Sequence, residues 1–207
     1  HTKTSSGTDN RGAMFHGQGG GADDHKENLE RYFQAIDRTL FPLLEDPKLP
    51  IILAGTEELH AVYHNVTKSG TILSKGIAGN VSDLSAEILQ AKAWKIAEEY
   101  FAEEDKKALR NFQDSLGGDK VTDDLQSILI AGLDGRIGNL FVVKNEQVWG
   151  IFDVDRRQVV VKNEQEGQAV NLLDEAVFLT LDKKGIVYVK TRQEMPLDAV
   201  VCAQLRY

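Results

Sequence analysis

The stretch Pro50-Ile51-Ile52-Leu53-Ala54-Gly55 decides the fold class of this chain of 207 residues. It is a short, continuous apolar run bounded by turn residues, which is typical of a buried strand in a parallel sheet. The segments on both sides have the periodicity of helices: apolar residues recur on one face over residues 24–44, and a shorter helix extends from Thr56 to about Asn65. A helix, a strand and a second helix in this order indicate the α/β class.

The rest of the N-terminal half extends this pattern. Residues 1–22 are polar and rich in glycine, so we expect a flexible arm, followed by a helix for which Asp24 and Glu27 form a capping box. A weaker strand is predicted at residues 71–73, and residues 77–80 are interpreted as a turn or linker. The predicted organisation is an arm at 1–22, a first domain at 23–80 and a second domain at 81–207.

The second domain is predicted to be a three-layer α/β/α unit with right-handed crossovers. Ser85 begins a long helix that ends before Gly117-Gly118, and Trp94 on its apolar pattern is expected in the core. Beyond this helix, apolar runs predict buried strands, and alternating segments predict a β-hairpin. In chain order these elements are a helix capped by Thr122, a buried strand at 140–143, a hairpin at 148–162, a helix from Asn171 to Leu181, a buried strand at 186–189 and a last strand from Ala199 to about Tyr207.

The composition excludes several classes of protein. The chain has 24 Lys and Arg against 32 Asp and Glu, a net charge of −8, so RNA binding through bulk positive charge is excluded and any contact with RNA has to be local. The single cysteine, Cys202, lies in an apolar run, which predicts a buried side chain and a reducing, cytoplasmic location. No stretch has the apolar length of a membrane helix, and the first residues do not resemble a signal peptide, so we expect no membrane partner.

The first candidate site is the loop Gly17-Gln18-Gly19-Gly20-Gly21, which leads into the first helix. Glycine lets the backbone approach a ligand closely, and the free N–H groups at a helix N-terminus suit a phosphate, an oxyanion or an RNA backbone. His16 and His25 flank the loop and could act as general bases. The alternative interpretation is a solvated arm without a ligand. Residues 132–138 are also rich in glycine, but they follow a predicted helix and are interpreted as its end and a turn.

His60 and His64 form a second candidate site. They are spaced four residues apart, so on the predicted short helix both face one side and could reach a metal ion. The residues between them lack the glutamate of the zinc-protease motif, and no third ligand has a clear spacing. Surface or half-buried histidines are the alternative, and we expect no metal and no cofactor.

The order of these pieces resembles a known family. Residues 15–24, the long helix and the strand at 51–55 are similar to the middle domain of bacterial members of the archaeo-eukaryotic release factor superfamily, particularly family three. In that superfamily a Gly-Gly-Gln loop precedes a long helix and an Ile/Leu-Leu-Ala-Gly strand. Residues 128–142 resemble the start of the C-terminal domain of these factors, and residues 202–207 resemble its end. The implied fold is part of a release-factor middle domain followed by a sandwich domain like that of ribosomal protein L7Ae.

This resemblance implies a protein of the translation apparatus, with the ribosome or tRNA as partner. In release factors the Gly-Gly-Gln loop enters the peptidyl-transferase centre and helps water attack the ester between the nascent peptide and tRNA. The related Pelota proteins rescue stalled ribosomes without this hydrolysis. The catalytic residues carried over to this sequence are Gly17, Gln18, Gly19, Gly20 and Gly21, in the order Gly-Gln-Gly-Gly-Gly, because Gly-Gly-Gln does not occur.

Two hypotheses follow from the resemblance. The first is a ribosome-associated release-factor-like or rescue protein that promotes hydrolysis of peptidyl-tRNA through this loop. The alternative is a non-catalytic module whose C-terminal domain binds RNA or a protein partner. The resemblance also predicts further sequence of the family upstream of His1.

Overall fold

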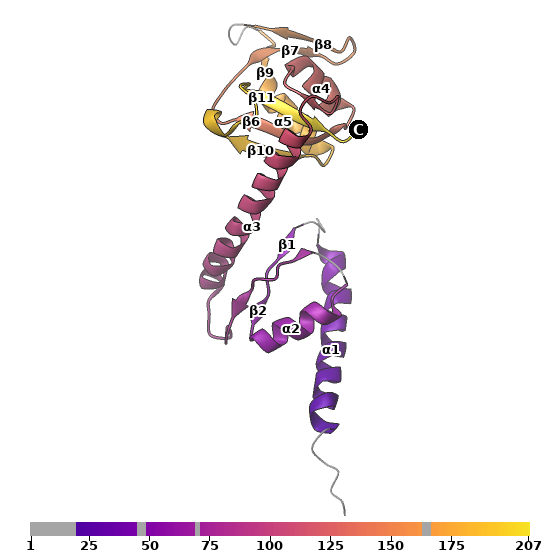
Figure 1. The fold of residues 1–207 in the computed structure, drawn as a ribbon, viewed down its shortest axis with the longest axis vertical. Helices are drawn as coiled ribbons and strands as arrows, with labels where there is room; N and C mark the ends of the chain where they lie inside the picture. Colours follow the sequence, from indigo (N-terminus) through magenta and orange to yellow (C-terminus); the bar gives the residue numbers. More distant parts are fainter. Residues whose placement is uncertain (1–19, 45–48, 69–70, 163–166) are drawn as a thin grey trace, which may run out of the picture. The chain divides into compact units, whose positions relative to one another are not determined.

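The computed structural model describes residues 20–44, 49–68, 71–162 and 167–207. The chain divides into two compact units, the first ending at Glu99 and the second beginning at Tyr100, so the division lies inside helix α3. The first unit contains α1 (Gly20–Leu40), the 3-10 helix η1 (Phe41–Leu43), β1 (Pro50–Ile51), β2 (Ala54–Gly55), α2 (Glu57–Val66), β3 (Thr71–Ile72), β4 (Ile77–Ala78) and the first part of α3 (Ala86–Asp114), as Figure 1 shows.

The fold-deciding stretch at residues 50–55 forms two short strands. β1 pairs with β3 and β2 pairs with β4, and both pairs are parallel. The predicted parallel pairing is therefore confirmed, but the prediction of one buried strand is wrong, because the chain changes its pairing partner within the stretch and its apolar side chains are only half-buried. The interpretation of residues 77–80 as a turn is also wrong at its start. The N–H of Ile77 donates to the carbonyl of Leu53 at 2.8 Å, and the buried Ile77 belongs to β4.

Helices α1 and α2 pack against each other through aromatic side chains. The rings of Phe33 and Tyr63 meet edge to face, with centroids 5.1 Å apart. The hydroxyl of the buried Tyr63 donates a hydrogen bond of 2.5 Å to Asp37 of α1. Thr56 is the N-cap of α2, as its sequence predicts. Packing and this one polar contact together fix α2 on α1.

Trp94 is exposed, so the prediction that it lies in the core is wrong. Its side chain is 58% exposed. Within residues 86–99, Ala97 is the one buried residue of α3. The apolar periodicity of residues 86–99 therefore does not predict which of their side chains are buried.

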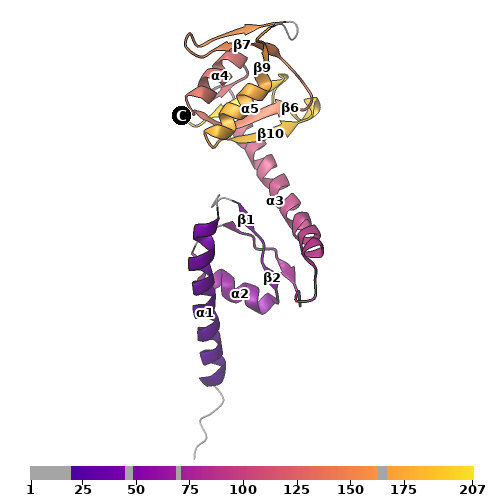
Figure 2. The same cartoon turned by 180° about the vertical axis from the view of Figure 1, so that it is seen from behind.

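The second unit is built on a four-stranded sheet with the order β10-β6-β11-β5. β10 runs parallel to β6, and β11 runs antiparallel to both β6 and β5. β7 and β8 form the predicted antiparallel hairpin, and β9 pairs with β7. In Figure 2, α5 lies in front of β6 and β10. The bounds are β5 (Val121–Thr122), α4 (Leu125–Leu133), β6 (Ile137–Val143), β7 (Trp149–Asp153), β8 (Gln158–Val161), β9 (Val170–Asn171), α5 (Leu172–Asp182), β10 (Ile186–Lys190), the 3-10 helix η2 (Arg192–Glu194) and β11 (Val201–Leu205).

Adjacent residues of β6 fill the cores on opposite faces of this sheet. Leu140 is fully buried in the core that includes residues of α4 and α5. Phe141 is fully buried in a second core with Phe112 of α3 and Cys202 of β11, and the rings of Phe112 and Phe141 are 5.4 Å apart. The alternation follows the two-residue period of a strand. The predicted α/β/α layering and the buried state of Cys202 are therefore confirmed.

Two details of the second unit differ from the predictions. Helix α4 is capped by Asp124, whose carboxylate accepts a hydrogen bond of 2.8 Å from the N–H of Ser127. Thr122 does not cap it, because this residue pairs in β5. β10 is an edge strand, and its side chains Ile186 and Val189 are 49% and 62% exposed, so it is not the buried strand that its apolar run predicts.

Candidate functional site

Only the end of the glycine-rich loop falls within the described residues. His16, Gly17, Gln18 and Gly19 lie outside them. The predicted loop residues Gly20 and Gly21 are helical, because α1 begins at Gly20 and not at the predicted Asp24. The first four N–H groups of a helix lack partners within the helix, so Gly20 and Gly21, the last two residues of the predicted loop, present such groups at the start of α1. His25 lies on α1 and is exposed.

The structure assigns His60 a packing role in α2. A Cβ atom added to Gly76 would lie 2.7 Å from Cε1 of the His60 ring, so the ring fits closely against this glycine. Nε2 of His60 is buried and has no hydrogen-bond partner, whereas His64 is exposed. In the part of the chain that the structure describes, no three His, Cys, Asp or Glu side chains are grouped so that they could hold a metal ion.

Each unit contains a pocket lined by both charged and apolar side chains. A pocket of about 440 Å³ in the first unit is lined by Gln34, Asp37, Arg38, Phe41, Pro42, Val66 and Lys68. A pocket of about 280 Å³ in the second unit is lined by Asp119, Thr122, Ser127, Ile130, Arg136 and Leu205. Neither lining includes a histidine or glycine of the predicted sites.

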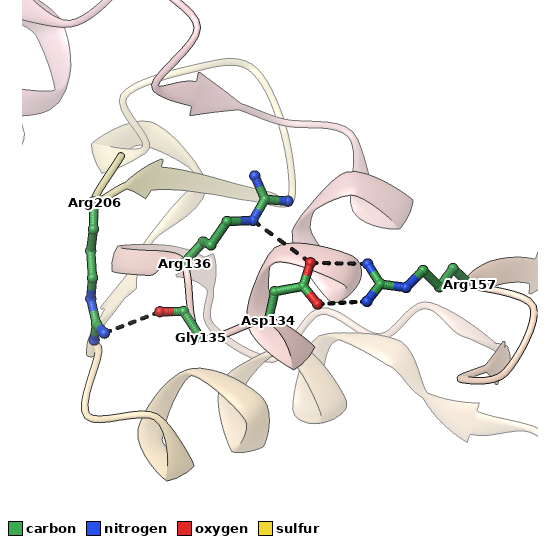
Figure 3. A network of polar contacts seen from close by, with 5 residues as sticks. All are labelled: Asp134, Gly135, Arg136, Arg157 and Arg206. Carbon is green, nitrogen blue, oxygen red and sulfur yellow. Dashed lines mark hydrogen bonds and ion pairs between the residues drawn. The ribbon is translucent and has the colours of Figure 1, made fainter.

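A network of polar contacts surrounds the turn that follows α4 (Figure 3). Asp134 is the C-cap residue of α4, and Gly135 has a φ of +70°, which favours glycine at the end of a helix. Arg157, at the turn of the β7–β8 hairpin, donates two hydrogen bonds of 3.0 and 2.8 Å to the two carboxylate oxygens of Asp134. Nε of Arg136 lies 3.8 Å from the same carboxylate. Arg136 and Arg157 approach Asp134 from opposite sides, as Figure 3 shows.

The C-terminal segment closes this network. The guanidinium of Arg206 donates to the carbonyl of Gly135 at 3.1 Å and to the carbonyl of Lys183 at 2.9 Å. The side chain of Lys183 lies beside Gly135, with its Cγ 3.5 Å from the position that a Cβ of Gly135 would occupy. Four segments that are far apart in the sequence therefore meet at one turn. We call Arg136, Arg157, Lys183 and Arg206 the cationic cluster.

The electrostatics of the cluster follow from these contacts. The hydrogen bonds from Arg157, helped by the charges of Arg157 and Arg136, lower the pKa of Asp134. The same pair raises the pKa of Arg157. The side chains of Arg136 and Arg157 are 35% and 52% exposed, so both cations remain accessible from solvent. One ionised carboxylate thus orders two arginines without covering them.

The sequence carries no motif for this cluster. The pattern at residues 132–138 predicts a helix end and a turn, and the segments around residues 155–157 predict a hairpin. The structure confirms the helix end and the hairpin, whereas residues 137–138 already belong to β6. Arg157 follows Asp134 by 23 residues, and neither turn specifies where the other lies in space. The sequence shows Asp134 in one predicted turn and the pair Arg156 and Arg157 in another, and this pattern does not by itself indicate a contact.

The sequence matches a family over most of its length. The matching family is described as "Bacterial archaeo-eukaryotic release factor family 3", and the match covers residues 2–136. This range includes the glycine-rich loop, the first unit and the second unit as far as Arg136. A comparison with curated proteins finds no significant match.

Solved structures of translation factors are similar to this chain. A chain from a structure described as a model of ribosome-bound archaeal Pelota and ABCE1 is 14% identical, with a TM-score of 0.52, over 86% of this chain and 49% of that one. This chain therefore spans about half of the length of that protein. The C-terminal domain of a peptide chain release factor from Methanosarcina mazei is 16% identical over 59% of this chain and 93% of that one, with a TM-score of 0.41. Pelota from Archaeoglobus fulgidus is 16% identical over 86% of this chain and 54% of that one, with a TM-score of 0.37.

The two kinds of similarity lead to one assignment. The shared fold agrees with the succession of two α/β units described above. The family match covers more than half of the 207 residues. The chain has a release-factor-like fold and belongs to bacterial archaeo-eukaryotic release factor family 3.

Proposed function

We propose that this chain acts in translation as a ribosome-associated protein of the release-factor or ribosome-rescue type. The observation that carries the proposal is the family match over residues 2–136, which includes the loop at residues 17–21 and helix α1. The fold shared with a chain of the structure of ribosome-bound archaeal Pelota and ABCE1 supports the same role. The proposed partners are the ribosome and tRNA, and the proposed location is the cytoplasm.

The proposed reaction is hydrolysis of the ester that joins a nascent peptide to tRNA. Water adds to the ester carbonyl carbon, the bond to the ribose oxygen of tRNA breaks, and this oxygen takes up a proton. The carboxamide of Gln18 would hold the attacking water. The free N–H groups at the start of α1, among them those of Gly20 and Gly21, would stabilise the oxyanion that develops. The reaction needs no metal or cofactor from the protein.

A peptide-release assay with ribosomes that carry peptidyl-tRNA tests this function. The unmodified chain should release peptide, and Gln18→Ala should reduce the rate by about 100-fold, the usual cost of removing one group that stabilises the transition state. Gln193→Ala is the matched control, because Gln193 is an exposed glutamine in η2. Equal release by Gln18→Ala and the unmodified chain would contradict a catalytic role of the loop.

The second candidate is a non-catalytic module that binds the translation apparatus through an L7Ae-like C-terminal unit. The order Gly-Gln-Gly-Gly-Gly favours it, since the side chain of Gln18 then has a different register to α1 than the glutamine of Gly-Gly-Gln. This candidate predicts sedimentation with ribosomes, no peptide release and no effect of Gln18→Ala. Absence of the unmodified chain from the ribosome pellet at low salt would overturn both candidates.

A further inference from the structure

We infer that the cationic cluster of Arg136, Arg157, Lys183 and Arg206 is a contact site for the phosphate backbone of RNA. The inference rests on the proposed function, which makes ribosomal RNA the source of these phosphates. It concerns the second unit alone and is independent of the glycine-rich loop. Figure 3 draws three of its side chains, Arg136, Arg157 and Arg206, at the turn after α4, and the side chain of Lys183 lies beside Gly135 of the same turn.

The local balance of charge at this turn differs from that of the unit as a whole. Residues 100–207 contain 14 Lys and Arg and 18 Asp and Glu, a net charge of 14 − 18 = −4. At the turn the balance is reversed, because the four cations of the cluster lie near three carboxylates: Asp134 and Asp182, which pair with them, and Asp119, which lines a pocket with Arg136. Because the net negative charge of the unit repels phosphate, an RNA contact on it requires a surface that is locally positive.

The geometry of the guanidinium groups supports the same inference. Arg157 uses two N–H groups on Asp134, and Arg206 uses two on backbone carbonyls. A guanidinium has five N–H donors, so each group keeps donors that are free of these contacts. These bonds hold the planar groups in place before binding, which reduces the entropy lost when a phosphate is bound. Arginine is also the residue whose paired donors match two phosphate oxygens.

Backbone carbonyls do not neutralise the charge of the cluster. Arg206 donates to two carbonyl oxygens, and within the described residues it forms no ion pair with a carboxylate. Arg136 lies 3.8 Å from Asp134, a carboxylate that Arg157 already engages with both oxygens. Lys183 pairs with Asp182 at 2.8 Å, and its side chain is 47% exposed. The cations of the cluster therefore outnumber the carboxylates near them, and a polyanion such as RNA supplies phosphates to several of the cations together.

The test measures how binding depends on salt. Each phosphate contact contributes about one unit to the slope of log K against log salt concentration. We expect each of the variants Arg136→Gln and Arg157→Gln to lower this slope by about one unit. Near 0.15 M salt this change corresponds to an affinity about five- to tenfold lower. Binding is measured to purified bacterial ribosomes and to protein-free ribosomal RNA. Arg192→Gln is the control with the same change of charge, because Arg192 lies on η2 and pairs with Asp198.

Asp134→Asn separates a phosphate contact from a purely structural ion pair. This variant breaks the bonds to Arg157 as Arg157→Gln does, but it raises the local charge. A phosphate site predicts that Asp134→Asn keeps the full salt slope of binding to ribosomal RNA, because Arg157 keeps its charge, whereas Arg157→Gln loses about one unit. A structural role predicts that the salt slopes of Asp134→Asn and Arg157→Gln change in the same way. Arg136→Gln keeps the bidentate pair intact, so it remains informative if the other two variants are less stable.

The outcomes distinguish this inference from the proposed function. If the unmodified chain binds ribosomes while Arg136→Gln and Arg157→Gln keep the full salt slope, the inference is overturned and the proposed function stands. If the unmodified chain binds neither ribosomes nor ribosomal RNA, the proposed function itself fails. If poly-glutamate binds with the same dependence on the cluster and ribosomal RNA does not, the partner is an acidic protein and the RNA assignment is wrong.

Discussion

Arg157 joins the β7–β8 hairpin to the end of α4 through two hydrogen bonds of 3.0 and 2.8 Å to Asp134. Arg157 has a φ of +53°, an uncommon value for a residue other than glycine. The turn of the hairpin and the end of the helix therefore meet in a fixed geometry. Together with the hydrogen bond of 3.1 Å from the N–H of Val159 to the side chain of Gln126, this contact holds the hairpin against α4.

The first prediction concerns the acid stability of this pair. Asp134→Asn should lower the free energy of unfolding at neutral pH by less than about 1 kcal/mol, because solvent screens a surface ion pair. The pKa of Asp134 is lowered in the folded state, so its contribution is present above the pKa of the unfolded chain and is lost as the pH falls. The unmodified chain should therefore lose more stability than Asp134→Asn below about pH 4. Urea unfolding at neutral and acidic pH measures this, and parallel losses in the two proteins would contradict it.

The second prediction concerns the contact between α1 and α2. Tyr63→Phe should lower the free energy of unfolding by about 1–2 kcal/mol, because it removes the hydrogen bond to an ionised partner and keeps the ring packed on Phe33. Tyr63→Ala should cost about 3 kcal/mol or more, since it also removes the buried ring. Equal stability of Tyr63→Phe and the unmodified chain would show that the hydroxyl contributes nothing.

The same contact predicts a dependence on alkaline pH. Burial, with the hydrogen bond and charge of Asp37, raises the pKa of Tyr63 from 10.0 to about 12. The neutral phenol is thus favoured in the folded chain, so its contribution is complete below pH 10 and is lost between pH 10 and about 12. An absorbance titration of the tyrosinates, compared between the unmodified chain and Tyr63→Phe, should show one group that ionises late. The prediction fails if the difference between the two curves is centred at 10.0.

The third prediction uses the packing of His60. Gly76→Ala should lower the free energy of unfolding by about 1–3 kcal/mol, because the new Cβ would lie 2.7 Å from both the His60 ring and the carbonyl of Leu53. Gly118→Ala is the control, since its nearest atom, the carbonyl oxygen of Ser115, would lie 3.4 Å away. Adding His60→Ala to Gly76→Ala should recover only part of the loss, because the backbone of Leu53 remains in the way. Thermal unfolding of the four proteins tests this set.

The fourth prediction concerns the thiol of Cys202. Burial, with a smaller effect of the charge of Asp123, raises its pKa to about 12, and the side chain is fully buried between β11, β6 and α3. A thiol reagent at mildly alkaline pH should therefore label the unfolded chain and not the folded chain. Cys202→Ser should be less stable than Cys202→Ala, because it buries a hydroxyl in an apolar core. Complete labelling while the far-ultraviolet circular dichroism remains native would contradict the packing.

The elements that the sequence predicts best are those with a local cause. Asn171 caps α5 with its own side chain, and the strand 140–143 forms because its continuous apolar run suits a sheet buried on both faces. The errors occur where packing between distant segments decides. β4 forms because the backbone at Leu53 and Gly55 is available for pairing, and Trp94 is exposed although it lies in an apolar helical pattern.

The candidate sites divide in the same way. The loop at residues 17–21 and the pair His60 and His64 are visible as short motifs, but their chemistry depends on surroundings that a motif does not specify. The ring of His60 lies against Gly55 and Gly76, and its buried Nε2 has no hydrogen-bond partner among the described residues. The cationic cluster has no motif at all, because its members come from four separate segments.

The sequence by itself determined the α/β class, the order of two units, the Asn171 cap and the release-factor resemblance, because these depend on local periodicity, short-range hydrogen bonds and the order of motifs. Only the tertiary structure decided which strands lie at the edge, which aromatic side chains are buried and where charge accumulates. The reason is that burial and electrostatic contacts depend on distances in space. Arg157 and Asp134 are 23 residues apart in the chain, but in the fold a guanidinium nitrogen of Arg157 lies 2.8 Å from a carboxylate oxygen of Asp134.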